Sequence, residues 1–211
     1  MIDYLLILLF VVVIGGFVWF IICRTRAFER VVRTNGFHPA TQCPPTINML
    51  CQELFVSDAD ALYQGGAESV WGDDAWIVSV RTGSDDPSQQ ALIVPAPASM
   101  VARFAASKTI GIKKVSGLLR TIDRVDPTFK RANLVLLPDP LQPYLSSGDG
   151  LVLYGDTQRD LRDHVPESVF RELLSEPGLG GMAVHKGHIV VWTTSQANPV
   201  GLLRIARALS S

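Results

Sequence analysis

The chain has 211 residues, of which 47% are hydrophobic and 18% charged, and its formal net charge is −1. This composition excludes an intrinsically disordered protein, because such chains have few apolar and many charged residues. Without its first 23 residues the chain carries 19 acidic and 19 basic side chains, and it is long enough for one sizeable core or two small ones.

The first predicted element is a transmembrane helix. Residues 4–23 contain no charged side chain. Twenty helical residues span ~30 Å, the thickness of the hydrocarbon core of a bilayer. Tyr4 and Trp19 lie near its two ends, where aromatic rings favour the lipid–water boundary. A cleaved signal peptide is the alternative, but residues 1–3 lack Lys and Arg, the apolar run is longer than usual, and no A-x-A site follows.

Two adjacent glycines, Gly15 and Gly16, leave a notch in this otherwise bulky segment. Val12, Gly16 and Phe20 are one helical turn apart and share a face. Helices associate in lipid by close packing at small residues, so these four residues predict contact with another integral membrane subunit. Glycine is also common in spans that only tether, and no G-x-x-x-G pair is present.

Basic residues follow the span and none precedes it, and the four closest are Arg24, Arg26, Arg30 and Arg33. Positive side chains favour the cytoplasmic side. The sequence therefore predicts a single-pass protein of the bacterial inner membrane, with its N-terminus outside and residues 24–211 in the cytoplasm. Helical spacing continues to Asn35-Gly36, a good helix stop. We predict an anchor with a basic extension over 1–34 and a soluble domain over 35–211.

The soluble domain is predicted from short segments with contrasting periodicity. Strands are expected to arrive as hairpins between helices, which is typical of an α+β fold with a mostly antiparallel sheet and helices packed on one face. Pro95-Ala96-Pro97 marks a candidate subdivision near 95–100. The predicted helices are 47–54, 98–108, 166–176 and 198–209, and the predicted strands are 76–81, 90–94, 109–122, 131–137, 150–154, 182–184 and 188–193.

Charge is unevenly distributed along the domain. Residues 35–100 carry eight acidic side chains and one basic, whereas residues 101–131 carry eight basic and two acidic. The two segments could neutralise each other within one fold. Alternatively Lys108, Lys113 and Lys114 join the four arginines in a basic face toward anionic lipid or an acidic partner. Nucleic acid is not an expected partner, because aromatics do not alternate with the basic residues and no recognised motif is present.

Motifs for catalysis, cofactors and metals are not found in the sequence. It has no phosphate-binding P-loop, no G-x-S-x-G and no H-E-x-x-H. The string 178–183 matches G-x-G-x-x-A but follows a predicted helix and precedes a strand, so a loop is expected. His38, Cys43 and Cys51 lack the close spacing of zinc ligands. His185 and His188 are expected in a solvated hairpin turn. We therefore predict no catalytic residue, cofactor or metal site.

The order of these elements resembles a loose group of uncharacterised bacterial membrane-anchored proteins. The resemblance rests on the span, the basic helix ending at Gly36-Phe37, the segment 129–135, and the hairpin ending in the apolar-Trp strand 189–192. It covers most of the chain as a layout and implies a single span before an α+β domain, but no activity or site residue.

The hypothesis that follows is a non-enzymatic accessory, assembly or scaffold subunit of an inner-membrane complex. The alternatives are a membrane-anchored, hydrolase-like enzyme with a scattered site, or a module that binds lipid or a small ligand.

Overall fold

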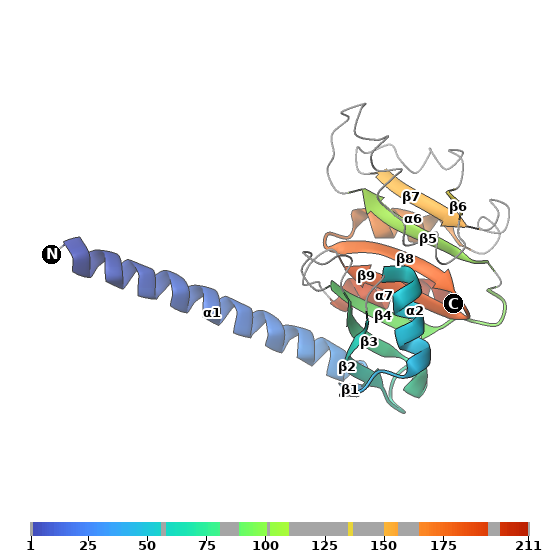
Figure 1. Cartoon of the computed structure of the whole chain (residues 1–211), viewed down its shortest axis with the longest axis horizontal. Coiled ribbons are helices and arrows are strands. Elements are labelled where there is room, and N and C mark those ends of the chain that lie inside the picture. The colour runs from blue at the N-terminus through green and yellow to red at the C-terminus, as the bar shows by residue number, and fades with distance from the viewer. Residues whose placement is uncertain are drawn as a thin grey trace.

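A computed structural model describes residues 2–55, 58–80, 89–100, 102–109, 135–136, 150–155, 165–193 and 199–210. The predicted strand 109–122, Lys113 and Lys114 lie outside these residues, except for the backbone of residue 109. The described residues form an α+β domain, from which one long helix extends (Figure 1).

Helix α1 (Ile2–Thr34) is continuous through the apolar segment and the arginines that follow it. It ends where predicted. The Asn35 and Gly36 amides donate to the carbonyls of Val32 and Arg33, and Gly36 adopts a φ of 80°. A left-handed residue after the last turn is the usual helix terminator, and glycine adopts it without strain.

The described residues of the domain form one nine-stranded sheet in which all neighbours are antiparallel. The strand order is β1-β2-β3-β4-β9-β8-β5-β7-β6, so the C-terminal hairpin lies in the middle. The strands are β1 (Phe37–Pro39), β2 (Asp60–Gly65), β3 (Trp76–Val80), β4 (Gln89–Pro95), β5 (Phe104–Thr109), β6 (Val135–Leu136), β7 (Gly150–Gly155), β8 (Leu179–His185) and β9 (His188–Thr193).

Both predicted hairpins are confirmed. Strands β3 and β4 pair with Ile77 opposite Leu92. Strands β8 and β9 are joined by Lys186 and Gly187, whose φ angles are 49° and 74°. Two consecutive positive φ angles are typical of the tight turn whose twist matches that of the flanking strands.

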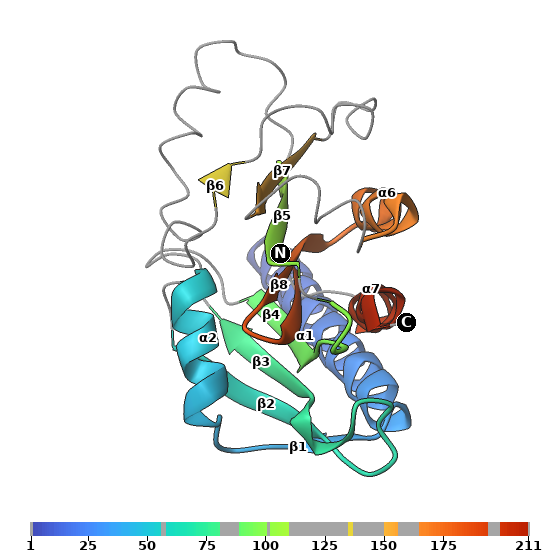
Figure 2. The ribbon, with the colours of Figure 1, turned by 90° about the vertical axis from the view of Figure 1, so that its right-hand side faces the viewer.

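The two faces of the sheet carry separate cores, because successive side chains along a strand point to opposite faces. In β3, Ile77 belongs to one core, and Trp76 and Val78 belong to the other. The first core lies under α6 (Glu167–Ser175), α7 (Pro199–Ser210) and the last turns of α1. The second lies under α2 (Pro45–Phe55). Figure 2 shows α2 on one side of the sheet and the other helices opposite. The α+β class is confirmed, but helices cover both faces instead of one.

Two local predictions are wrong. Residues 98–108 contain most of strand β5 instead of a helix, because Phe104 and Ala106 alternate with Ala105 between the two cores. Residues 179–181 belong to strand β8 instead of a loop, so the predicted strand 182–184 begins three residues earlier. The glycines there serve packing: a Cβ on Gly181 would lie 2.2 Å from Cζ2 of Trp192.

Candidate functional site

The apolar part of α1 is a candidate membrane span. Within the segment Phe10–Thr34, the most apolar window of 18 residues has a mean hydropathy of 1.8, and none of that window is buried. The large apolar side chains of residues 10–22 are exposed, and Phe10, Phe17 and Trp19 each expose about two thirds of their surface. Length and composition fit a helix that crosses a bilayer, and they also fit a signal sequence.

The predicted packing residues form an open surface on this helix. Val12, Gly16 and Phe20 recur every four residues along continuous helix, which places them on one face. A Cβ built on Gly15 or Gly16 would meet no atom within 4 Å outside the helix's own backbone. No described residue of the domain covers this notch, so a neighbouring helix would have access to it.

The last turns of α1 are packed into the domain. Val32 is fully buried in the first core, with Phe28 and Val31 packed against it. The Phe28 ring lies 6.0 Å from that of Tyr63 on strand β2, centroid to centroid. These apolar contacts hold the end of α1 against the sheet and its covering helices.

Polar contacts with α7 complete this junction. The side-chain oxygen of Asn35 accepts a 2.6 Å hydrogen bond from Nη2 of Arg207. The side-chain nitrogen of Asn35, Nδ2, donates to the Val31 carbonyl at 2.8 Å. The Arg207 guanidinium carbon lies 6.0 Å from the centroid of the Trp71 ring. The indole N–H of Trp71 donates to the Ser210 hydroxyl at 3.1 Å. The first and last helices of the chain are therefore tied together.

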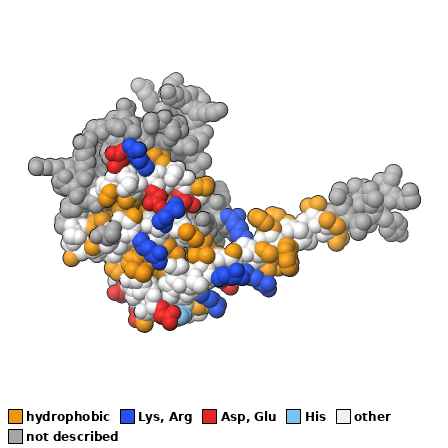
Figure 3. All heavy atoms as spheres, turned by 180° about the vertical axis from the view of Figure 1, so that it is seen from behind, with side chains coloured by type: hydrophobic (Ala, Val, Ile, Leu, Met, Phe, Trp, Pro, Cys, Tyr) orange, Lys and Arg blue, Asp and Glu red, His pale blue; other side chains and the backbone are white. Residues whose placement is uncertain are grey.

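The predicted basic residues fall into different environments. Arg24, Arg26, Arg30 and Arg33 are exposed on α1. Figure 3 shows Lys and Arg side chains gathered on the part of the long helix next to the domain, with hydrophobic side chains beyond them. Lys108 instead donates a 2.6 Å hydrogen bond to the Glu176 carbonyl at the end of α6. It is thus engaged within the domain.

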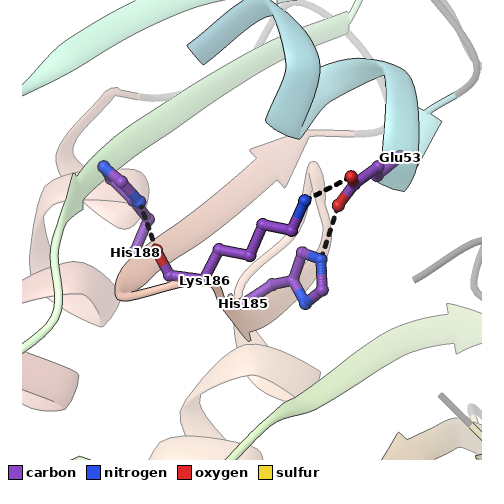
Figure 4. A network of polar contacts seen from close by, with 4 residues as sticks. All are labelled: Glu53, His185, Lys186 and His188. Carbon is purple, nitrogen blue, oxygen red and sulfur yellow. Dashed lines mark hydrogen bonds and ion pairs between the residues drawn. The ribbon is translucent and has the colours of Figure 1, made fainter. Parts of the chain in front are cut away.

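A polar network joins α2 to the β8–β9 hairpin, and it is buried at His185 and exposed at Lys186 (Figure 4). Nε2 of His185 donates to Oε2 of Glu53 at 2.8 Å, and the Lys186 ammonium pairs with the other oxygen of that carboxylate. His185 is only 2% exposed. The expectation that His185 lies in a solvated turn is therefore wrong, because α2 covers it. His188 is not part of this contact, and its Nδ1 lies 3.0 Å from the Lys186 carbonyl oxygen.

The network keeps a negative carboxylate beside a neutral imidazole. Burial lowers the pKa of His185, against the opposing effect of Glu53, and Arg103 and Lys186 lower it further. Burial on its own would raise the pKa of Glu53, but the hydrogen bonds and charges of Lys186 and His185 outweigh it, so the pKa is lowered.

A histidine held by a carboxylate through one ring nitrogen can accept a proton at the other. Here Nδ1 of His185 is buried and has no hydrogen-bond partner among the residues that the structure describes. Because this nitrogen is buried, we assign the network a structural role. Glu53 connects α2 to His185 and Lys186 of the hairpin. No pattern in the sequence indicates Glu53, which lies 132 residues before His185.

In the described part of the chain, no group of three His, Cys, Asp or Glu residues is placed to hold a metal ion. Cys51 is fully buried in α2, and burial, followed by the charge of Cys43, raises its pKa to about 12. Such a thiol is unreactive at neutral pH.

Together these features define an α+β domain that carries an exposed apolar helix packed firmly into it at one end. No model of a known protein family, no curated protein and no solved structure matches the chain.

Proposed function

We propose that α1 anchors the chain in the bacterial inner membrane and that the domain acts on the cytoplasmic side as a non-enzymatic accessory or scaffold subunit of a membrane complex. The observation that carries this proposal is the apolar surface of α1, which the described parts of the domain leave uncovered. Partners would be lipid and other integral membrane subunits.

The free energy at stake supports a bilayer around α1. Each large apolar side chain left in water forgoes about 1.5–3 kcal/mol of burial. The exposed ones on α1 are Phe10, Val11, Val12, Val13, Ile14, Phe17, Val18, Trp19, Phe20, Ile21 and Ile22. Even at half of full exposure they amount to on the order of 10 kcal/mol, which is similar to the total stability of a typical domain. A lipid environment removes this cost.

The first test is membrane integration of the full chain. Ile14→Asp with Val18→Asp places two charges in the centre of the span, and each should cost about 2.5–3.5 kcal/mol of insertion free energy. The wild type should resist extraction by alkaline carbonate, and the double variant should be extracted. Val70→Asp is the matched control, because Val70 is 72% exposed on the domain. Recovery of a mature chain that lacks the apolar segment would instead identify a signal peptide.

The second test concerns orientation. A reporter that functions only in the cytoplasm should be active when it is fused after the last residue. The reason is that the four arginines after the span favour the cytoplasmic side. Activity of an exported-side reporter, such as a periplasmic phosphatase, would contradict this topology.

The third test concerns the accessory role. Purification in mild detergent should recover other integral membrane proteins with the wild type. A carbonate-resistant chain that is recovered alone under these conditions would contradict the role in a complex while leaving the anchor intact.

A further inference from the structure

Three of the exposed arginines form a stripe along α1. Arg26, Arg30 and Arg33 are spaced by four and three residues, which places them on one face of a helix. The residues that pack into the domain, Phe28 and Val32, fall on the opposite face at 3.6 residues per turn. The stripe therefore lies on the side of α1 opposite these packing residues, and at its end near the domain the charge of Arg33 reaches Tyr63 of strand β2.

In the part of the chain that the structure describes, the side chains of these arginines make no ion pair or hydrogen bond. Arg171 and Arg204 of the domain form ion pairs with glutamates of α6 and of the turn that follows it. Among the described residues, by contrast, no ion pair or hydrogen bond engages the side chain of any arginine in the stripe. Glu29, four residues before Arg33, does not pair with it either. The positive charge of the stripe thus remains available to an external anion.

The position of the stripe along the helix matches the lipid headgroups. The uncharged segment ends at Cys23, so Arg26 and Arg30 lie about 5 and 10 Å further along the axis. Each headgroup layer of a bilayer is ~5–7 Å thick. Helical side chains lean toward the N-terminus, and arginine extends its head group several ångströms, so both guanidinium groups can reach back to the phosphates.

We infer that Arg26 and Arg30 of the stripe bind the phosphate groups of anionic phospholipids, and this inference rests on the proposed membrane anchor. Arg33, about 15 Å beyond Cys23 along the axis, adds its positive charge to the attraction of anionic lipid. Guanidinium groups pair well with phosphate oxygens, and basic side chains close to a membrane surface favour anionic lipid. Each arginine near the headgroups should enrich anionic lipid around α1 by up to about fivefold.

The full chain can be tested in nanodiscs with brominated lipids, which quench nearby tryptophan fluorescence. Trp19 lies within the span, and a Trp19→Phe variant measures the background from the other tryptophans. Brominated phosphatidylglycerol should quench the wild type at a several-fold lower mole fraction than brominated phosphatidylcholine. Replacing Arg26, Arg30 and Arg33 with Gln should remove this preference.

The controls separate charge from other effects. Replacing the same three residues with Lys should keep most of the preference, and Arg171→Gln on the domain should leave it unchanged. Salt at 1 M should reduce it, because the screening length falls to about 3 Å. Equal quenching by the two lipids in the wild type would overturn the inference, although the anchor would stand. Absence of Trp19 quenching by both lipids would instead overturn the anchor.

Discussion

Replacement of Glu53 is the sharpest test of the polar network that joins Glu53 to His185 and Lys186. In Glu53→Ala, the Nε2 hydrogen of His185 loses its acceptor inside the domain, and a buried donor without a partner costs about 1–3 kcal/mol. The ion pair with Lys186 adds little, because 46% of the lysine side chain is exposed and such pairs contribute at most about 1 kcal/mol. We therefore expect a loss of about 2 kcal/mol in the free energy of unfolding.

Two further variants divide this loss. Glu53→Gln keeps an oxygen that can accept from His185 and should cost less than about 1 kcal/mol. Lys186→Met removes only the exposed partner and should cost a few tenths of a kcal/mol, roughly the value of a surface pair. Urea unfolding of the full chain in mild detergent, followed by tryptophan fluorescence, measures all three. A loss below about 0.5 kcal/mol in Glu53→Ala, or an equal loss in Lys186→Met, would refute the structural role that we assign to the buried contact.

The penalty should depend on pH in a defined direction. The pKa of Glu53 is lowered in the folded chain, so its stabilising effect is present above the ordinary glutamate pKa and is lost as pH falls through the lowered value. The pKa of His185 is also lowered, so the unfolded chain binds its proton first and stability falls from about pH 6.5 downward. Because Glu53 raises the pKa of His185, Glu53→Ala lowers that pKa further and loses more stability than the wild type as His185 titrates. The difference between the wild type and Glu53→Ala should therefore grow as pH falls below about 6.5, and shrink below about pH 4, where Glu53 becomes protonated.

Three other outcomes follow from single positions. Gly36→Ala should cost more than about 2 kcal/mol in urea unfolding, because φ is positive and the new Cβ would lie 2.4 Å from the Ser69 backbone nitrogen. Gly187→Ala, where φ is also positive but the space is open, should cost only about 1 kcal/mol, and equal losses would contradict the steric argument. Gly16→Leu should preserve carbonate resistance but reduce recovery of partner proteins; unchanged recovery would show that the span only tethers. Cys51 should resist alkylation at pH 8 until urea unfolds the domain, and rapid labelling of the native chain, measured by mass spectrometry, would show that this thiol is accessible.

Local patterns predicted the elements that depend on local chemistry. Helix α6 follows from an apolar stripe, and the β8–β9 hairpin follows from Lys186-Gly187 between apolar runs. Strands β1 and β2 were not predicted, because β1 has three residues and ends in a proline and β2 has mixed polarity. The helix expected at 98–108 failed because Phe104 and Ala106 obtain their partners from strands β7 and β8 far along the chain.

The same distinction applies to the candidate site. The span could be predicted because absence of charge over one continuous segment is a local property. The contacts that hold the end of α1 against the domain could not be predicted in this way. Asn35 meets Arg207 across 172 residues, and neither residue belongs to a motif. The fold alone brings them together, so no spacing rule in the sequence could indicate their contact.

The junction of α1 with the domain makes helical geometry decide how the domain is presented to its neighbours. Because α1 runs unbroken from Gly16 to Val32, one additional residue between them would turn the domain by about 100° about the helix axis and displace it by about 1.5 Å. In a membrane, a partner seated against the Gly16 face would then meet a different side of the sheet. The number of residues in α1, as much as their identity, thus selects which side of the domain a neighbour within the bilayer can reach.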